Sequence, residues 1–149
     1  MAIEIRKIAL PIPGVELLLA EAKKEGFDFV EALIEHWETG ENRFDAPGEI
    51  LCGCFNGSQL VAVGGLNLDP FAGSLEVGRI RRIYVRPTWR NRGIGRSLVA
   101  LLVEHARTHF SCVRLRAENA GAARLYESLG FVPIENPDAT HLLSFNKPE

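Results

Sequence analysis

Residues 79–107 read RIRRIYVRPTWRNRGIGRSLVALLVEHAR, and this stretch decides what kind of fold the chain forms. The first part mixes apolar and basic residues in a pattern that predicts a strand over residues 77–85, which Pro87 ends. The last part repeats apolar residues at helical spacing, which predicts a helix over residues 96–109. Strands that alternate with helices in this way are typical of an α/β fold.

The loop between this strand and this helix is Arg90-Asn91-Arg92-Gly93-Ile94-Gly95. Glycines let the backbone turn tightly, and the free N–H groups at a helix start attract anions, so the loop is suited to a phosphate or pyrophosphate. Arg90, Arg92 and Arg96 add positive charge around it. The dinucleotide-binding pattern is not met because Leu98 replaces its third glycine, and the Gly-Lys-Ser/Thr of a P-loop is absent from the sequence.

The flanking sequence predicts further elements of one sheet. Apolar runs predict strands over residues 3–6, 50–55, 60–68, 112–117, 131–134 and 141–145. Helical spacing predicts helices over residues 15–25, 29–39 and 120–129, the second of them capped by Asp28. We therefore expect a single domain over residues 1–149, with an α/β fold in which a twisted mixed sheet carries helices on both faces.

The composition narrows the class of function. The chain has 149 residues, 46% apolar and 24% charged, which suffices for a core without disulfides or metals. The net charge of −2 argues against a nucleic-acid binder or a membrane-surface protein. No apolar run approaches the roughly 20 residues of a membrane helix, and residues 1–10 lack the apolar core of a signal peptide.

The chain has an odd number of cysteines, namely Cys52, Cys54 and Cys112, and its core needs no disulfide bonds for stability. This favours a reducing cytoplasm and buried thiols that act as small apolar side chains. Cys52 and Cys54 lack a second Cys/His pair at zinc spacing, so we expect no metal site.

Three features together resemble the GNAT N-acetyltransferase superfamily. They are the strand end Tyr84-Val85-Arg86-Pro87, the pattern Arg90-x-x-Gly93-x-Gly95 before an apolar helix, and the segment NAGAARLYESLGF over residues 119–131. The resemblance covers residues 76–131 closely and the order of elements along the whole chain. It implies a GNAT-like sheet whose central parallel strands, here residues 79–85 and 112–117, splay apart.

The resemblance further implies that acetyl-CoA, as cosubstrate, binds between those two strands. Its pyrophosphate would contact the backbone amides of residues 92–97, and its pantetheine arm would pair with residues 83–85 like an extra strand. Asn119, also a good helix N-cap, would contact that arm. The implied cofactor-binding residues are Ile83, Tyr84, Val85, Arg90, Asn91, Arg92, Gly93, Ile94, Gly95, Arg96, Ser97, Asn119 and Tyr126.

The chemistry expected at such a site is direct transfer in a ternary complex. A neutral amine attacks the thioester carbonyl, and the backbone N–H of Val85 is a suitable donor for the oxyanion. Tyr126 would give a proton to the departing thiolate, although its helix face also fits a core aromatic. Because no cysteine has a histidine partner evident in the sequence, we do not expect covalent catalysis.

The general base is where the sequence departs from the family. Many members carry a Glu near the start of the strand that leads into the V-x-P segment, and Arg79 stands there. Glu76, three residues earlier, is our candidate catalytic base. Glu118, His141 and a water-mediated route are the alternatives.

We expect the acceptor to be a primary amine of a small molecule or a protein. Arg79, Arg81 and Arg82 hint at an acceptor that bears a carboxylate, or form a solvated face. Acidic residues between Glu31 and Glu41 instead hint at a cationic amine, or form the wet face of a helix. An alternative function is a non-catalytic acyl-CoA-binding module, and a third is another kind of nucleotide-phosphate binder. A homodimer through the hairpin around residues 136–141 is a further possibility.

Overall fold

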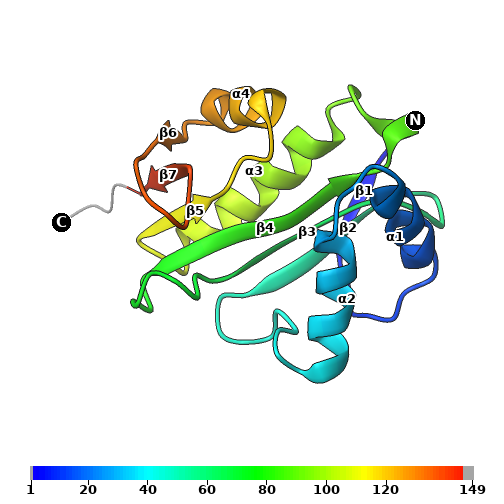
Figure 1. Ribbon diagram of the computed structural model, residues 1–149, viewed down its shortest axis with the longest axis horizontal. Coiled ribbons are helices and arrows are strands. Elements are labelled where there is room, and N and C mark those ends of the chain that lie inside the picture. The colour runs from blue at the N-terminus through cyan, green and yellow to red at the C-terminus, as the bar shows by residue number, and fades with distance from the viewer. Residues whose placement is uncertain (1, 146–149) are drawn as a thin grey trace.

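A seven-stranded mixed sheet runs through the molecule in the order β1-β2-β3-β4-β5-β7-β6 (Figure 1). The structure is a computed structural model and describes residues 2–145. The strands are β1 (Glu4–Lys7), β2 (Ile50–Asn56), β3 (Gln59–Leu68), β4 (Val77–Val85), β5 (Cys112–Leu115), β6 (Val132–Pro133) and β7 (His141–Ser144). The helices are α1 (Val15–Lys24), α2 (Phe29–Thr39), the 3₁₀ turn η1 (Pro87–Trp89), α3 (Ile94–Arg107) and α4 (Ala120–Ser128).

Helices cover both faces of this sheet, as the sequence predicts (Figure 1). On one face α1 and α2 pack through fully buried residues such as Leu18 and Leu33. On the other face α3 packs through Leu98 and Leu102, and α4 adds the ring of Tyr126. Each large apolar side chain buried in this way stabilises the fold by roughly 1.5–3 kcal/mol, so the two cores fix the sheet firmly between its helices.

The two central strands, β4 and β5, are parallel and stay paired for only three residues. Val77, Gly78 and Arg79 pair with residues 112–114, and no pairing continues from Ile80 onward. β5 turns instead toward β7, with which it pairs antiparallel over its whole length. The sheet therefore opens between β4 and β5, which is the splayed arrangement that the resemblance implies.

β4 contains a bulge just beyond the point where the strands part. Tyr84 pairs with Val63 and Arg81 pairs with Gly65, so Gly64 of β3 faces two residues of β4, Arg82 and Ile83. Arg82 has a φ of 63°, in the left-handed region that costs an L-residue roughly 1–2 kcal/mol. The bulge changes which side chains of β4 face each side of the sheet.

Several element bounds and one helix cap differ from the expectations. Asp28 stands at the N-cap of α2, but its side chain makes no capping hydrogen bond. α3 begins at Ile94, two residues earlier than predicted, because Gly93 adopts φ 80° and turns the chain directly into the helix. β5 ends at Leu115 instead of residue 117, where Ala117 donates its N–H to the Thr140 hydroxyl.

No helix within residues 2–145 combines the length and the apolar character needed to cross a membrane. All the strands within residues 2–145 belong to one sheet. That a single domain extends over residues 1–149 stays a prediction. The same holds for dimerisation through the segment that joins β6 to β7.

Candidate active site

The gap between β4 and β5 exposes one edge of β4. Arg86 donates its N–H to the Val61 carbonyl of β3 at 2.9 Å. Because backbone N–H groups alternate along a strand, the N–H of Val85 points to the opposite edge, into the gap. The N–H of Val85 is thus oriented as expected for the predicted oxyanion donor.

The glycine loop lies at the mouth of this gap, where α3 begins. Ser97 makes the first helical hydrogen bond, to the Gly93 carbonyl at 3.0 Å, so the N–H groups of Ile94, Gly95 and Arg96 have no partner within the helix. A Cβ placed on Gly95 would lie 3.6 Å from Cγ2 of Val85 and 3.9 Å from Leu125. The helix start therefore presents free amides beside the end of β4 and beside α4.

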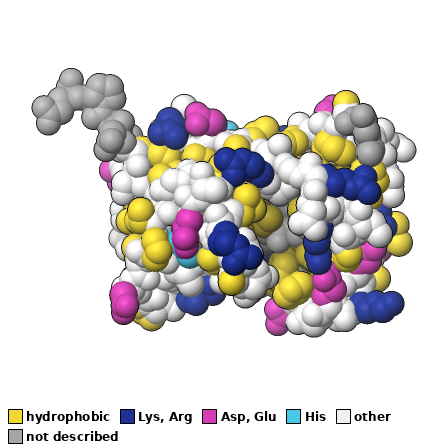
Figure 2. Space-filling model, turned by 90° about the horizontal axis from the view of Figure 1, so that it is seen from above, with side chains coloured by type: hydrophobic (Ala, Val, Ile, Leu, Met, Phe, Trp, Pro, Cys, Tyr) yellow, Lys and Arg dark blue, Asp and Glu magenta, His cyan; other side chains and the backbone are white. Residues whose placement is uncertain are grey.

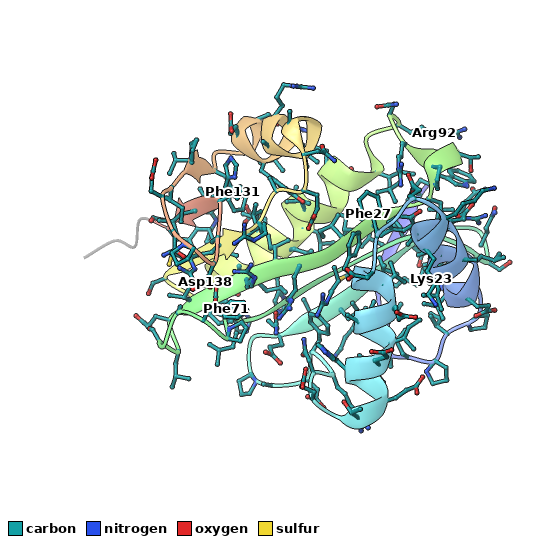
Figure 3. The ribbon with its side chains drawn as sticks, viewed as in Figure 1. Lys23, Phe27, Phe71, Arg92, Phe131 and Asp138 are labelled. Atoms are coloured by element: carbon teal, nitrogen blue, oxygen red, sulfur yellow. The ribbon has the colours of Figure 1, made fainter. Side chains whose placement is uncertain are left out.

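The three arginines of the loop have different surroundings. Arg92 is exposed, with its guanidinium 4.8 Å from the ring of Trp89 at the end of the molecule (Figure 3). Arg96 donates to the Ser128 hydroxyl at 2.6 Å and links α3 to α4. Arg90 donates two hydrogen bonds to Glu25, at 2.6 and 2.7 Å, and a third to the Val85 carbonyl. Arg90 is thus engaged in holding the loop to α1.

Tyr84 directs its side chain away from the gap. Its ring is 3% exposed and packs edge-on to Phe29, and its hydroxyl donates to Glu25 at 2.6 Å. The Arg90 hydrogen bond is the main cause that lowers the pKa of Glu25, and Tyr84 contributes to the same shift. Its side chain therefore does not line the gap, and its backbone pairs with Val63 of β3.

Tyr126 reaches the gap from α4. It lines a cavity of about 130 Å³ together with residues of β4, with Phe29, and with Arg116 and Glu118 beyond β5. Its ring is 7% exposed and packs edge-on to Phe131. Burial, aided by Glu118, raises the pKa of Tyr126 to about 12, so the phenol stays protonated near neutral pH. Its hydroxyl makes no hydrogen bond to any residue in the described range 2–145 and is free to serve a ligand.

Asn119 serves as the N-cap of α4, because its Oδ1 accepts the N–H of Ala122 at 2.9 Å. This contact confirms the capping role that the sequence suggests. It fixes the start of the helix that carries Tyr126.

Of the three candidate bases, one lines the cavity of Tyr126 and two do not. Glu76 lies before the closed end of β4, where it accepts a hydrogen bond from Ser111, and it does not line the cavity. His141 is buried between Glu127 and Thr140, at 2.8 Å from each, and does not line it either. Glu118 shares the cavity with Tyr126. The structure therefore brings Tyr126 together with Glu118 and not with Glu76.

One buried carboxylate, which sequence reasoning missed, joins the two parallel strands where they part. Asp69 accepts from Arg114 of β5 at 2.9 Å and from Arg79 of β4 at 3.3 Å, and its side chain is fully buried. Arg79 also donates to the Asp138 carbonyl. Burial disfavours the charged form of Asp69, but the two arginines and the Phe71 N–H outweigh it, and the pKa of Asp69 is lowered. Arg79 is thus a structural residue, which contacts Phe71 and Asp138; Figure 3 labels both of these partners.

A second hollow, of about 600 Å³, lies under α2 and the segment 40–49 and shares Arg81 with the first. Asn67 of β3 lines it, 6% exposed, and its Oδ1 has no partner among the described residues. Seen from above, the molecule shows a furrow between its two halves with Lys and Arg side chains along it (Figure 2). Within residues 2–145, no group of three or more His, Cys, Asp or Glu side chains could hold a metal ion.

A family model described as "Acetyltransferase (GNAT) family" matches residues 15–131. The match spans the helices α1 to α4 and the open edge of β4. This family consists of transferases, and the chain belongs to the GNAT acetyltransferase family.

Solved structures agree with this assignment. A candidate acetyltransferase from Exiguobacterium sp. 255-15 is 28% identical, with a TM-score of 0.85 over 97% of this chain and 94% of that one. The PaiA N-acetyltransferase from Thermoplasma acidophilum, solved with coenzyme A, shares the fold at 19% identity, with a TM-score of 0.65 over 99% of this chain and all of that one.

A curated relative is similar over a shorter stretch. The L-methionine sulfoximine/L-methionine sulfone acetyltransferase of Salmonella typhimurium is 36% identical over 52 residues. These residues are 33% of this chain and 30% of that enzyme, so the match spans less than a third of the relative's length.

Proposed function

We propose that this protein is an N-acetyltransferase that moves the acetyl group of acetyl-CoA directly to a primary amine of a small molecule or a protein. One observation carries the proposal. The free amides at the start of α3, the open edge of β4 and the unpaired hydroxyl of Tyr126 border the same gap.

The residues present fit the carrier. The free amides of Ile94, Gly95 and Arg96 and the exposed guanidinium of Arg92 suit a diphosphate. At the open edge of β4, the N–H of Val85 points into the gap and is available to the amide-bearing arm, and Asn119 lies at the start of the helix that borders it. Acetyl-CoA supplies an activated acetyl thioester when bound. Arg90 keeps the loop in place through Glu25 and leaves phosphate contact to the amides and to Arg92 and Arg96.

The residues of the chain then act on protons and charge. The N–H of Val85 stabilises the negative charge that develops on the carbonyl oxygen. Tyr126, held protonated by burial, donates its proton to the departing thiolate. Glu118 accepts the proton of the amine, directly or through water, because it is the carboxylate that lines the cavity.

Cysteine chemistry has no part in this proposal. Cys52 and Cys54 are buried, and burial raises the pKa values of their thiols to about 11 and about 12. Thiols that stay protonated are poor nucleophiles. The unpaired thiols are also the reason that we assign the protein to a reducing cytoplasm.

A non-catalytic acyl-CoA-binding module is the second candidate. It is favoured by the position of Glu118, which is exposed and therefore a weakly positioned base. Two measurements separate the functions. Acetyl-CoA should raise the melting temperature more than ATP or NAD does, and a screen of amines should reveal release of free CoA thiol. Stabilisation by acetyl-CoA without thiol release from any amine supports the module, and equal stabilisation by ATP contradicts both.

A further inference from the structure

The bulge in β4 brings two neighbouring arginines to the same face of the sheet. In a regular strand, Arg81 and Arg82 would point to opposite faces. Here Arg82 lies 3.4 Å from Nδ1 of His36 on α2, and Arg81 lines the hollow beneath the same helix. The left-handed backbone of Arg82 is a strained conformation that the surrounding structure maintains. Both arginines therefore line the cavity of Tyr126, next to the open edge of β4.

Arg81 and Arg82 differ from the other partly or fully buried arginines because neither forms an ion pair with a carboxylate within residues 2–145. The other arginines of this kind are paired: Arg79 and Arg114 with Asp69, Arg86 with Glu21 and Arg90 with Glu25. The side chain of Arg82 contacts His36, whereas the side chain of Arg81 makes no hydrogen bond or ion pair within the same residues. Burial and the charges of Arg82 and Arg79 lower the pKa of Arg81 to about 10. The side chain still carries its charge near neutral pH and lacks a carboxylate partner.

Arg81 also occupies a position that a substrate-binding residue needs. It lines both the cavity of Tyr126 and the larger hollow under α2. The acids of that hollow are partly engaged already, because Glu41 pairs with His36 and Glu49 accepts the N–H groups of Ala46 and Leu68. A volume of about 600 Å³ suits a small molecule rather than a folded partner.

We propose, on the basis of the proposed function, that the acetyl acceptor is a free amino acid whose carboxylate binds to Arg81 and Arg82. A guanidinium pair recognises a carboxylate through parallel, charge-assisted hydrogen bonds. The amine then faces the cavity of Tyr126, while the side chain of the acceptor extends into the hollow. The unpaired Oδ1 of Asn67 is available there to accept a hydrogen bond from a polar side chain.

The specificity test compares acceptors that differ only at the carboxylate. A panel of free amino acids is assayed beside the matching carboxamides and decarboxylated amines, with CoA release as the readout. The free acids should have a kcat/KM at least about tenfold higher than their neutral partners, because an unmet charged group in the site is penalised. A peptide amine that reacts as well as the free acid, or an amide that matches it, overturns the carboxylate proposal while the proposed function stands.

Variants locate the contact. Arg81→Gln and Arg82→Gln should abolish the preference for free acids, and Arg81→Lys should retain part of it. Arg107→Gln, which removes an exposed charge at the end of α3, is the control and should keep the preference. Unchanged preference in Arg81→Gln overturns the assignment.

A binding measurement tests the carboxylate contact even where a variant loses turnover. With CoA present, a free amino acid should raise the melting temperature of the wild type and not that of Arg81→Gln. Absence of CoA release with every amine, together with no response to acetyl-CoA, overturns the proposed function itself.

Discussion

The phenol of Tyr84 donates a 2.6 Å hydrogen bond to Oε1 of Glu25, and this contact joins the open end of β4 to the end of α1. Glu25 also receives two hydrogen bonds from Arg90. A single carboxylate therefore fixes the strand edge and the glycine loop relative to each other. The proposed site requires these two parts at a fixed position relative to each other.

Replacing Glu25 by Gln should make stability less dependent on pH. The folded-state pKa of Glu25 is lowered from 4.5, so its charge stabilises the fold above that pH and the contribution disappears as the pH falls through the lower folded pKa. Wild type should exceed Glu25→Gln by about 1–2 kcal/mol at pH 7, and the gap should shrink below pH about 4.5. Denaturant unfolding across pH 3–7 measures it, with the exposed Glu135→Gln as control. A gap that widens in acid contradicts the ion pair.

The two glycines of the loop should respond differently to alanine. Gly93 has φ 80°, so Gly93→Ala should cost roughly 1–2 kcal/mol of stability. A methyl group on Gly95 meets only ordinary contacts with Val85 and Leu125, so Gly95→Ala should fold normally. Because that methyl group projects between β4 and α4, Gly95→Ala should weaken acetyl-CoA binding about tenfold, or about 1.4 kcal/mol. Calorimetry of binding and thermal melts separate the two effects, and tight binding by Gly95→Ala would count against the proposed cofactor position.

Removing the Tyr126 hydroxyl should affect turnover and spare binding. Tyr126→Phe keeps the ring against Phe131 and loses the proton donor, so kcat should fall by roughly 10²–10⁴. The affinity for acetyl-CoA and the melting temperature should change little. Steady-state kinetics with any amine found active test this, and full activity would remove Tyr126 from the mechanism.

The backbone of Arg82 should reverse the usual order of glycine and alanine. At φ 63°, Arg82→Gly should be more stable than Arg82→Ala by about 1 kcal/mol, because glycine adopts this conformation without strain. At Arg81, where φ is not positive, alanine should be the more stable of the two. Paired denaturation curves for the four variants decide whether the bulge exists in solution.

Local patterns made most of the fold predictable. Residues 77–109 contain their own strand, loop and helix signals, and the helix that carries Tyr126 is marked by Asn119 at its start. Contacts between distant residues were not predictable. Glu25 and Arg90 are 65 residues apart, and Asp69 and Arg114 are 45 apart, so only the folded sheet brings them together.

Sequence reasoning could not anticipate that Glu76 lies outside the cavity that Tyr126 lines. It stands just before β4, but the length over which two strands pair cannot be read from either strand alone. β4 and β5 pair at Val77–Arg79, which leaves Glu76 at the closed end. The bulge was equally hidden, because an arginine carries no signal for a left-handed backbone.

The carboxylate of Asp69 forms ion pairs with Arg79 of β4 and Arg114 of β5, the two diverging strands. Asp69 therefore ties β4 to β5 at the point where the two strands part. This connection opposes further separation of the strands when a ligand enters the gap. The closed end of the gap is thus held by an ion pair to each strand as well as by the strand hydrogen bonds, whereas the open end lies between α4 and the glycine loop.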